Sequence, residues 1–184
     1  MNKYFRVSIS AINGAGKGLL LKLMHGNNFK IKRGAIMSPL SEISLDKGSV
    51  CNIGEHFKIR GGGRIRVRKN AKLDIKNNVF FNHNCMIVCQ NKITIGDEVQ
   101  FGPNVFLYDH DHDYKDENGL KSGKFKVGTI EIGNNVWIGA NSIILRNTKI
   151  GNNCVIAAGS VIKGEFPDNT VVYQEENTNI KKYK

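Results

Sequence analysis

Residues 132–161 read IGNNVW, IGANSI, ILRNTK, IGNNCV and IAAGSV, five hexads that each begin with isoleucine. Four positions after each isoleucine stands a small or β-branched residue, and Gly, Asn or Ala occupies most of the places between. A fixed period this short is typical of a solenoid, in which each repeat stacks on the one before it. This stretch therefore predicts the fold of the chain around it.

The period fits short β-strands joined by tight corners. A strand places successive side chains on opposite faces, so the isoleucines point inward, and Gly and Asn supply the positive φ angles of a sharp corner. A helix is excluded by the repeated glycines, each of which costs about 1 kcal/mol in a helix interior. Looser hexads begin at Phe29. Turns of about 18 residues predict roughly seven turns over residues 30–165, each burying its isoleucines on those of the next.

The composition indicates a globular protein in a reducing compartment. The chain has 184 residues, 40% of them hydrophobic, and no apolar run reaches the roughly 18 residues of a membrane-spanning helix. The N-terminus shows no signal-peptide pattern, so we expect a cytoplasmic protein. Four cysteines without a CxxC pair predict buried thiols. The formal net charge of +11 is compatible with peripheral contact with an anionic membrane, but without an aromatic-rich basic motif we expect no nucleic-acid binding.

The sequence divides into three parts. Residues 1–29 do not follow the period and are predicted to be irregular or helical, with a short helix at Gly18–Met24. Residues 30–166 are predicted to form the solenoid, which residues 108–129 interrupt as a polar loop. An insertion this long in a compact fold is usually functional or disordered. Residues 167–184 are predicted to be a C-terminal tail.

The insertion contains the run DHDHD at residues 109–113. A calcium loop is a poor fit, because Tyr114 replaces the required glycine and Leu120 replaces the required glutamate. A solvated acidic loop is a second interpretation. The third is a histidine general base that a neighbouring carboxylate holds and orients, and we favour it because histidine titrates near neutral pH.

These segments resemble the hexapeptide-repeat acyltransferases, and within them the maltose, galactoside and capsular-sugar O-acetyltransferases. The resemblance covers residues 75–172 and is carried by the histidine-bearing loop and four motifs: Ile95-Gly-Asp97, Phe101-Gly-Pro-Asn-Val105, Ile132-Gly-Asn-Asn-Val-Trp-Ile-Gly-Ala140 and Ala158-Gly-Ser-Val161. It implies an all-β, left-handed parallel β-helix that assembles as a homotrimer. It also implies that acetyl-CoA lies between neighbouring subunits and acetylates a hydroxyl of a sugar or of a surface-polysaccharide precursor.

The resemblance also implies roles for single residues. The family's catalytic histidine corresponds best to His112, and His110 stays a second candidate because the loop varies in length across the family. The histidine removes the proton of the acceptor hydroxyl as that oxygen attacks the thioester. Asn82 lies where similar enzymes place an asparagine that contacts the acceptor, and we assign Asp109 to the acceptor as well. Cys89 stands where the family has an acidic acceptor-binding residue, which points to an acceptor other than the simple hexosides.

For the acetyl-CoA site the resemblance implies a wall of small residues beside one tryptophan. Ala140 and Ala158 match positions whose backbone binds the pantetheine arm, and Gly139 belongs to the same wall. Trp137 follows an inward valine, so it is predicted to point outward into the groove. Lys163 is the candidate phosphate ligand, although it stands one place before the family's usual lysine. No metal ligand is predicted.

Three alternatives stay open. An N-acetyltransferase for an amino sugar or a nucleotide-sugar differs only in the acceptor. A zinc hydratase on the same solenoid needs three converging histidines, for which His83, His110 and His112 are available. A non-catalytic protein that binds anionic surfaces would use the basic charge and the N-terminal segment.

Overall fold

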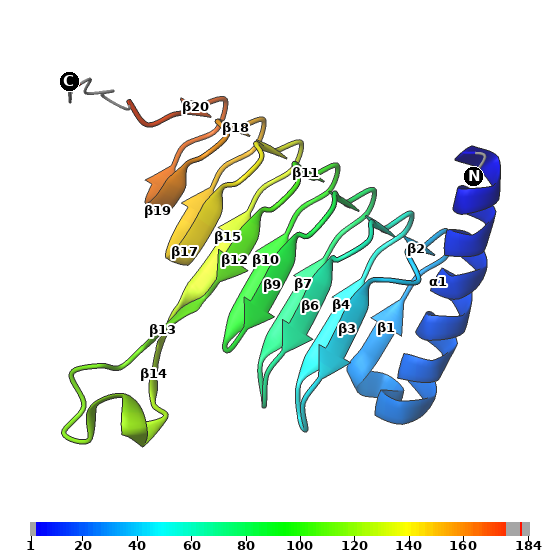
Figure 1. Cartoon of the computed structure of the whole chain (residues 1–184), viewed down its shortest axis with the longest axis horizontal. Helices are drawn as coiled ribbons and strands as arrows, with labels where there is room; N and C mark the ends of the chain where they lie inside the picture. Colours follow the sequence, from blue (N-terminus) through cyan, green and yellow to red (C-terminus); the bar gives the residue numbers. More distant parts are fainter. Residues whose placement is uncertain (1–2, 176–180, 182–184) are drawn as a thin grey trace.

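The chain forms a β-solenoid that one α-helix closes at its N-terminal end (Figure 1). The computed structural model describes residues 3–175 and residue 181, with the backbone alone for residues 3–7. Helix α1 (Lys3–His25) and the 3₁₀ helix η1 (Gly26–Asn28) precede the first strand. The predicted left-handed parallel β-helix is the fold of the chain.

Each turn contains three strand positions, which stack into three faces. The first face contains β1 (Phe29–Ile31), β4 (Val50–Ile53), β7 (Lys72–Ile75), β10 (Lys92–Ile95) and β15 (Thr129–Ile132). The second face contains β2 (Ile36–Met37), β5 (Lys58–Ile59), β8 (Phe80–Phe81), β11 (Gln100–Phe101), β16 (Trp137–Ile138), β18 (Val155–Ile156) and β20 (Val171–Val172). The third face contains β3 (Glu42–Leu45), β6 (Arg64–Val67), β9 (Met86–Cys89) and β12 (Phe106–Tyr108). Two longer strands, β17 (Ile143–Ile150) and β19 (Val161–Phe166), run around a corner from the third face to the first.

The hexad pattern predicts the core correctly. The isoleucines that open the five hexads are all buried: Ile132, Ile138, Ile144, Ile150 and Ile156. The four cysteines are also buried and free, as predicted: Cys51, Cys85, Cys89 and Cys154. Asparagine occupies many of the corners with positive φ angles, and the side-chain amides of Asn84, Asn104 and Asn141 form a hydrogen-bonded row along one corner, with lengths of 3.3 and 2.9 Å.

The turns shorten along the chain, which corrects the predicted number of turns. Hydrogen-bonded partners on adjacent turns are 22 residues apart at Asn52, 20 apart at Asn77 and 18 apart at Asn134. Because the early turns are longer than three hexads, the described residues form about six turns. Strand β20 falls within the predicted tail 167–184, of which residues 176–180 and 182–184 lie outside the described part.

Helix α1 contains the predicted helical segment Gly18–Met24 but is much longer, so the predicted length was wrong. Three glycines within residues 14–18 disfavour a helix in isolation. Gly14 instead allows the helix to approach the first turn closely, since an added Cβ would lie 2.7 Å from the carbonyl oxygen of Ala35. Tertiary contact therefore outweighs the low helix propensity of the glycines.

Helix α1 covers the N-terminal end of the solenoid. Asn13 Nδ2 donates to the carbonyl oxygen of Met37 at 3.0 Å. The Lys17 ammonium donates to three further carbonyl oxygens, those of Ser38, Pro39 and Ser41, and partial burial lowers the pKa of Lys17. The outer side of the helix exposes large apolar residues: Ile12, Leu19, Leu20, Leu23 and Met24. Among the described helices, none has the length and apolar character needed to cross a membrane.

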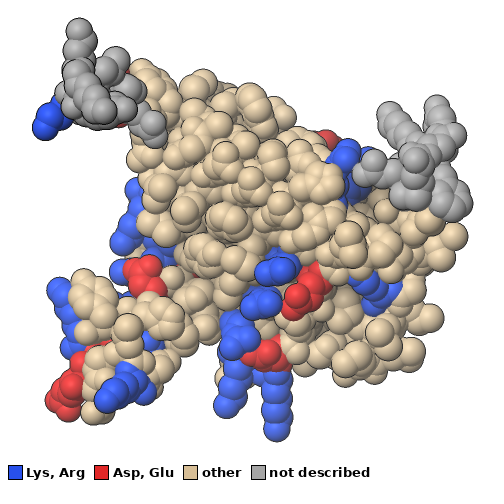
Figure 2. Space-filling model, viewed as in Figure 1, with Lys and Arg blue, Asp and Glu red and all other residues tan. Residues whose placement is uncertain are grey.

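The insertion is a β-hairpin with a 3₁₀ turn near its tip. It occupies residues 109–128, between β12 and β15, where residues 108–129 were predicted. Strand β13 (His110–His112) pairs antiparallel with β14 (Phe125–Val127), and η2 (Gly119–Ser122) lies between them. The hairpin projects from the body of the solenoid (Figure 1). It carries acidic and basic side chains next to one another, whereas much of the visible body is uncharged (Figure 2).

Candidate active site

Two edges of the solenoid hold the residues predicted for the site. The hairpin edge joins the third face to the first and contains residues 90–91, 109–128, 146–147 and Lys163. The glycine edge joins the second face to the third and contains residues 60–63, 82–85, 102–105, 139–142 and 157–160. Within one chain the third face lies between the two edges.

Asp109 anchors the hairpin to the solenoid. Its carboxylate is fully buried and accepts hydrogen bonds from the backbone N–H groups of Gln90 at 2.7 Å and Asn91 at 2.8 Å, one turn earlier. The N–H of Gly128 donates to the carbonyl oxygen of Asp109 at 2.7 Å and closes the root of the hairpin. This burial contradicts the predicted contact between Asp109 and an acceptor, because both carboxylate oxygens are occupied inside the protein.

Cys89 lies beside this anchor and faces the core. Burial raises the pKa of the Cys89 thiol, and the charge of Asp109 raises it further. The thiol therefore stays protonated at neutral pH and does not reach the surface. The family's acidic acceptor contact thus has no equivalent at this position.

His110 is enclosed at the start of β13. Its Nδ1 lies 3.2 Å from Asp109 Oδ1, and only 13% of its side chain is exposed. The aromatic rings of Tyr108 and Phe125 meet the imidazole edge-on, at centroid distances of 6.2 and 5.2 Å. Donation from Nδ1–H to the buried carboxylate fixes the orientation of the ring. This is the histidine and carboxylate pair that the sequence interpretation required, but most of its surface is covered.

His112 lies two residues further along β13 and is exposed. Alternate residues of a strand share a side, and the His112 ring contacts the same Phe125 ring at a centroid distance of 4.7 Å. The residue between the histidines, Asp111, has its Oδ2 2.5 Å from Arg146 Nε on the solenoid wall. The contact of Asp111 with Arg146 ties β13 to the solenoid wall, and His112 stays exposed to solvent.

The glycine edge brings together Asn82 and most of the predicted acetyl-CoA wall. The N–H of Gly102 donates to the carbonyl oxygen of Ile138, and the N–H of Gly139 donates to that of Ile156, both at 2.8 Å. Asn82 occupies the equivalent place on an earlier turn, and its Oδ1 accepts a hydrogen bond from the N–H of His83 at 2.9 Å. The residues of this edge therefore form one row along the solenoid axis.

Small residues are required along this row. Gly139 is buried, and a Cβ on it would lie 2.4 Å from the backbone nitrogen of Ala158. Any larger residue at this position would therefore push the two turns apart. Ala140 is half-buried and Ala158 is exposed, which leaves an uncovered strip of wall. Trp137 points outward as predicted and is 57% exposed, beside Gln100 and Val155 on the adjacent turns.

Two predicted groupings are not formed within one chain. Lys163 lies on the hairpin edge, across the third face from Ala158. His83 lies on the glycine edge, away from His110 and His112 on the hairpin. Within residues 3–175 and residue 181, no group of three or more His, Cys, Asp or Glu side chains is arranged to hold a metal ion.

The sequence analysis did not identify the apolar outer surface of the third face. Two rows of outward side chains run up this face, namely Met86, Phe106, Ile143 and Val161 in one row and Val88, Tyr108 and Leu145 in the other. The rings of Phe106 and Tyr108 are stacked with centroids 6.4 Å apart. The available signal was apolar residues at both inward and outward positions of these strands, where a solvated face would alternate with polar residues.

Comparison with known proteins decides the family. The model of the bacterial transferase hexapeptide family, which describes six repeats, matches residues 129–164. The putative lipopolysaccharide biosynthesis O-acetyl transferase WbbJ of Escherichia coli is 32% identical over 144 residues, which are 74% of this chain and 73% of that protein. The chain belongs to the hexapeptide-repeat acyltransferases.

Two further proteins are similar to this acyltransferase. The galactoside O-acetyltransferase of Escherichia coli is 31% identical over 156 residues, covering 85% of this chain and 71% of that protein. The solved structure of a mutant of AntD, an N-acyltransferase from Bacillus cereus, in complex with dTDP-4-amino-4,6-dideoxyglucose and coenzyme A, has a TM-score of 0.68. It is 20% identical and covers 84% of this acyltransferase and 82% of AntD, a likeness that shows the fold.

Proposed function

We propose that the protein transfers the acetyl group of acetyl-CoA to a hydroxyl of a sugar, with His112 as the general base. The observation that carries this proposal is the hairpin, which holds one enclosed histidine and presents a second to solvent. Two relatives with O-acetyltransferase names support the choice of reaction and of a saccharide acceptor. The four buried, free thiols fit a reducing compartment, and we place the enzyme in the cytoplasm.

His112 has the access that a base requires. Its imidazole takes the proton from the acceptor hydroxyl as the hydroxyl oxygen attacks the thioester carbonyl carbon. The C–S bond then breaks, the thiolate of coenzyme A takes the proton from the imidazolium, and the acetyl ester is released. Histidine suits both transfers because its ordinary pKa lies near neutral pH.

His110 and Asp109 act as positioning residues in this proposal. The His110 ring is covered by Tyr108 and Phe125, so an acceptor has little room to reach it. His110 in turn supports Phe125, whose ring contacts His112. The buried carboxylate of Asp109 therefore determines the place of His112 through two aromatic contacts.

The complete site needs a second copy of the chain. Asn82 and the acetyl-CoA wall lie on the glycine edge, whereas His112 lies on the hairpin edge, and the third face lies between them. The apolar rows of that face are suited to burial against a neighbouring subunit. We propose a homotrimer in which the hairpin of one subunit reaches the glycine edge of the next.

The glycine edge is suited to the donor. A long, slender pantetheine arm approaches the backbone most closely where side chains are small, as at Ala140 and Ala158. Trp137 offers an exposed apolar surface beside this strip. The candidate ligand for the phosphate groups of acetyl-CoA is Lys163 of a neighbouring subunit. Within one chain, Lys163 lies across the third face from the glycine edge and is too distant from it.

The test is acetyl transfer measured as free thiol released from acetyl-CoA. His112→Ala is expected to lower kcat by about 10² to 10⁴-fold, since that is the usual contribution of a general base. Trimer formation, checked by light scattering, and coenzyme A binding, checked by calorimetry, are expected to survive. His25→Ala on α1 is the matched control and is expected to retain full activity.

The same series decides between the two histidines. If His112→Ala stays active and His110→Ala loses transfer, the base is His110. If both variants stay active, the histidine mechanism is wrong. Transfer to an amino sugar in place of a hydroxyl acceptor would favour the N-acyltransferase alternative, which the structural likeness to AntD supports.

A further inference from the structure

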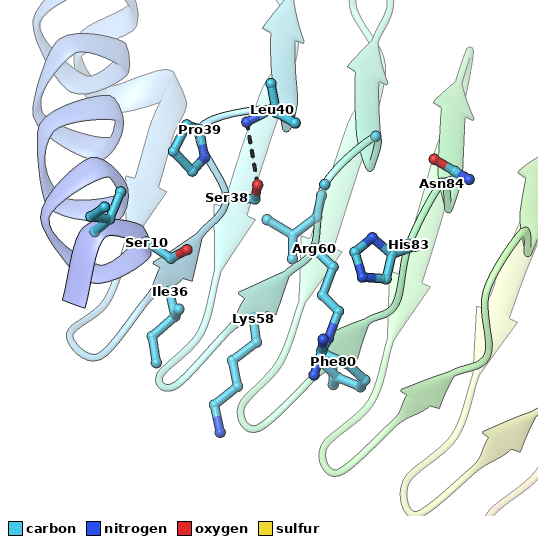
Figure 3. A pocket seen from close by; sticks show the side chains of 14 residues that line it. Ser10, Ile36, Ser38, Pro39, Leu40, Lys58, Arg60, Phe80, His83 and Asn84 are labelled. Atoms are coloured by element: carbon cyan, nitrogen blue, oxygen red, sulfur yellow. Dashed lines mark hydrogen bonds between the residues drawn. The ribbon is translucent and has the colours of Figure 1, made fainter. Parts of the chain in front are cut away.

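A groove of about 1300 Å³ lies beside α1 at the N-terminal end of the glycine edge (Figure 3). The first three turns and one side of α1 line it. Ile36 and Leu40 come from the first turn, Lys58 and Arg60 from the second and Phe80 from the third. The groove combines an apolar lining with two cationic side chains, and the function proposed above uses none of these residues.

The two cations in the groove differ from the neighbouring arginines. Arg66 pairs with Glu42, and Arg68 pairs with Asp46, at 3.6 and 3.5 Å. Lys58 and Arg60 are both exposed. Neither has an acidic partner within 4 Å among the described residues. The side chains that line the groove likewise include no Asp or Glu within the described part of the chain.

A smaller hollow of about 500 Å³ adjoins the groove and shares Lys58, Arg60 and Phe80 with it. Its one lining carboxylate in the described chain is Glu98, whose Oε1 accepts a hydrogen bond from Asn78 Nδ2 at 2.6 Å. Both hollows therefore open onto the same two cations, and Glu98 is the one carboxylate that lines either of them in the described part of the chain. The local charge favours an anionic ligand.

The guanidinium of Arg60 lies over the Phe80 ring, with Cζ 5.4 Å from the ring centroid, and this contact favours one position of the guanidinium (Figure 3). Stacking on a ring leaves the N–H donors of the planar guanidinium free around its rim. Such a fixed fork binds the oxygens of a phosphate group in pairs, and a lysine next to it adds a point charge. The arrangement therefore matches a phosphate group better than an uncharged sugar.

The groove leads directly to the proposed transfer site. The N–H of Arg60 donates to the carbonyl oxygen of Phe81 at 3.0 Å, so Arg60 is stacked one turn before Asn82. His83 and Asn84, which follow Asn82, line the groove. Adjacent turns are about 4.8 Å apart. A group bound by Arg60 is thus close enough to belong to the same ligand as a sugar at Asn82.

We propose that the acceptor is a phosphorylated sugar, whose phosphate or diphosphate group binds Lys58 and Arg60 in this groove. The proposal rests on the proposed acetyl transfer for the position of the sugar. The apolar lining then contacts whatever the phosphate carries beyond it. That part is a nucleoside in a nucleotide-sugar or an isoprenoid chain in a lipid-linked sugar, and both contain the same phosphate chemistry.

The experiment compares acceptors and variants with acetyl-CoA as donor. The acceptors are glucose, glucose 1-phosphate, UDP-glucose and glucose on a short polyprenyl diphosphate. The double variant Lys58→Ala/Arg60→Ala is expected to raise KM at least 10-fold for the phosphorylated acceptors and to leave kcat nearly unchanged, because a phosphate contact is equally strong before and during transfer. KM for glucose is expected to stay the same. The best of the three phosphorylated acceptors identifies the group beyond the phosphate.

The matched control is Lys76→Ala/Lys92→Ala, which removes the same charge from exposed positions outside the groove. Binding of inorganic pyrophosphate is measured by calorimetry on the wild-type protein, the groove variant and the control variant. We expect the groove variant to weaken pyrophosphate binding at least 10-fold and the control to leave it unchanged. Equal weakening in both variants, or in neither, would overturn the groove proposal. If pyrophosphate binds as expected but no acceptor is acetylated, the groove stands and the proposed transfer fails.

Discussion

The solenoid makes the same corner in two successive turns with very different lengths of chain. After β9, residues 90–91 lead directly into β10, whereas after β12 residues 109–128 intervene before β15. Both connections reach the same register: Lys72, Lys92 and Thr129 lie side by side on the first face. The stacked strands therefore fix where the chain must return, and the length of chain between them is free to vary.

Asp109 shows how the longer connection keeps that register. Its carboxylate binds the backbone of the short connection at Gln90 and Asn91, and its carbonyl oxygen binds Gly128 at the other end of the insertion. The root of the hairpin thus belongs structurally to the solenoid. The part beyond the root contributes little to the core, and it is the part that carries the histidines.

Removing the hairpin gives the sharpest test of this difference. Deletion of residues 110–127 would join Asp109 to Gly128 and reproduce the two-residue corner of the turn before. We expect acetyl transfer to be abolished, because both histidines are lost. The melting temperature is expected to stay within about 4 °C, equivalent to about 1 kcal/mol for a chain of this size. Unfolding of the deletion variant would show that the hairpin supports the core.

Removing the anchor is expected to have the next largest effect. Asp109→Ala leaves the buried N–H groups of Gln90 and Asn91 without an acceptor, and we expect the free energy of unfolding in urea to fall by about 3 kcal/mol. Asp109→Asn keeps one acceptor and should cost less. Acetyl transfer is expected to fall in both variants, since the hairpin loses its fixed root. A stable, fully active Asp109→Ala protein would mean that the strands alone set the register.

The smallest expected effect concerns the outer part of the hairpin. The hydrogen bond from Lys124 to Asp116, 2.7 Å long, lowers the pKa of Asp116, and the backbone N–H of Asn118 contributes further. Because the folded pKa is below the ordinary value, this stabilisation is present at neutral pH and is lost as the pH falls through the folded pKa. In an NMR titration of the carboxyl groups, Lys124→Met should raise the pKa of Asp116. Acetyl transfer near neutral pH should not change.

The fold was predictable from sequence because its signal repeats. Each hexad gives independent evidence for an inward isoleucine and a corner, so Ile132 and its equivalents could be placed without knowledge of long-range contacts. The number of turns was less predictable, since the early turns have longer corners that blur the period, such as residues 68–71 between β6 and β7 against residues 90–91 between β9 and β10. Most of helix α1 was missed because Gly14 lowers the local helix propensity. The glycine is needed for the close contact with Ala35, and a local propensity does not reveal such a contact.

The candidate site was predictable only in part for a related reason. The histidines and Trp137 stand out by residue type, but nothing in the run DHDHD shows which carboxylate is buried. That depends on the turn before it, where two backbone N–H groups require an acceptor. The phosphate groove depends on residues from three turns, and Lys58 and Arg60 look in the sequence like any other surface cations.

Helix α1 has a consequence for how the molecule ends. An uncovered first turn of a β-helix would offer its unpaired backbone groups as a template to the strands of another chain. Asn13 and Lys17 occupy carbonyl oxygens at this end, and the helix covers the first turn. The helix thereby opposes end-to-end growth into fibrils, and it keeps a repetitive chain as a molecule of defined length.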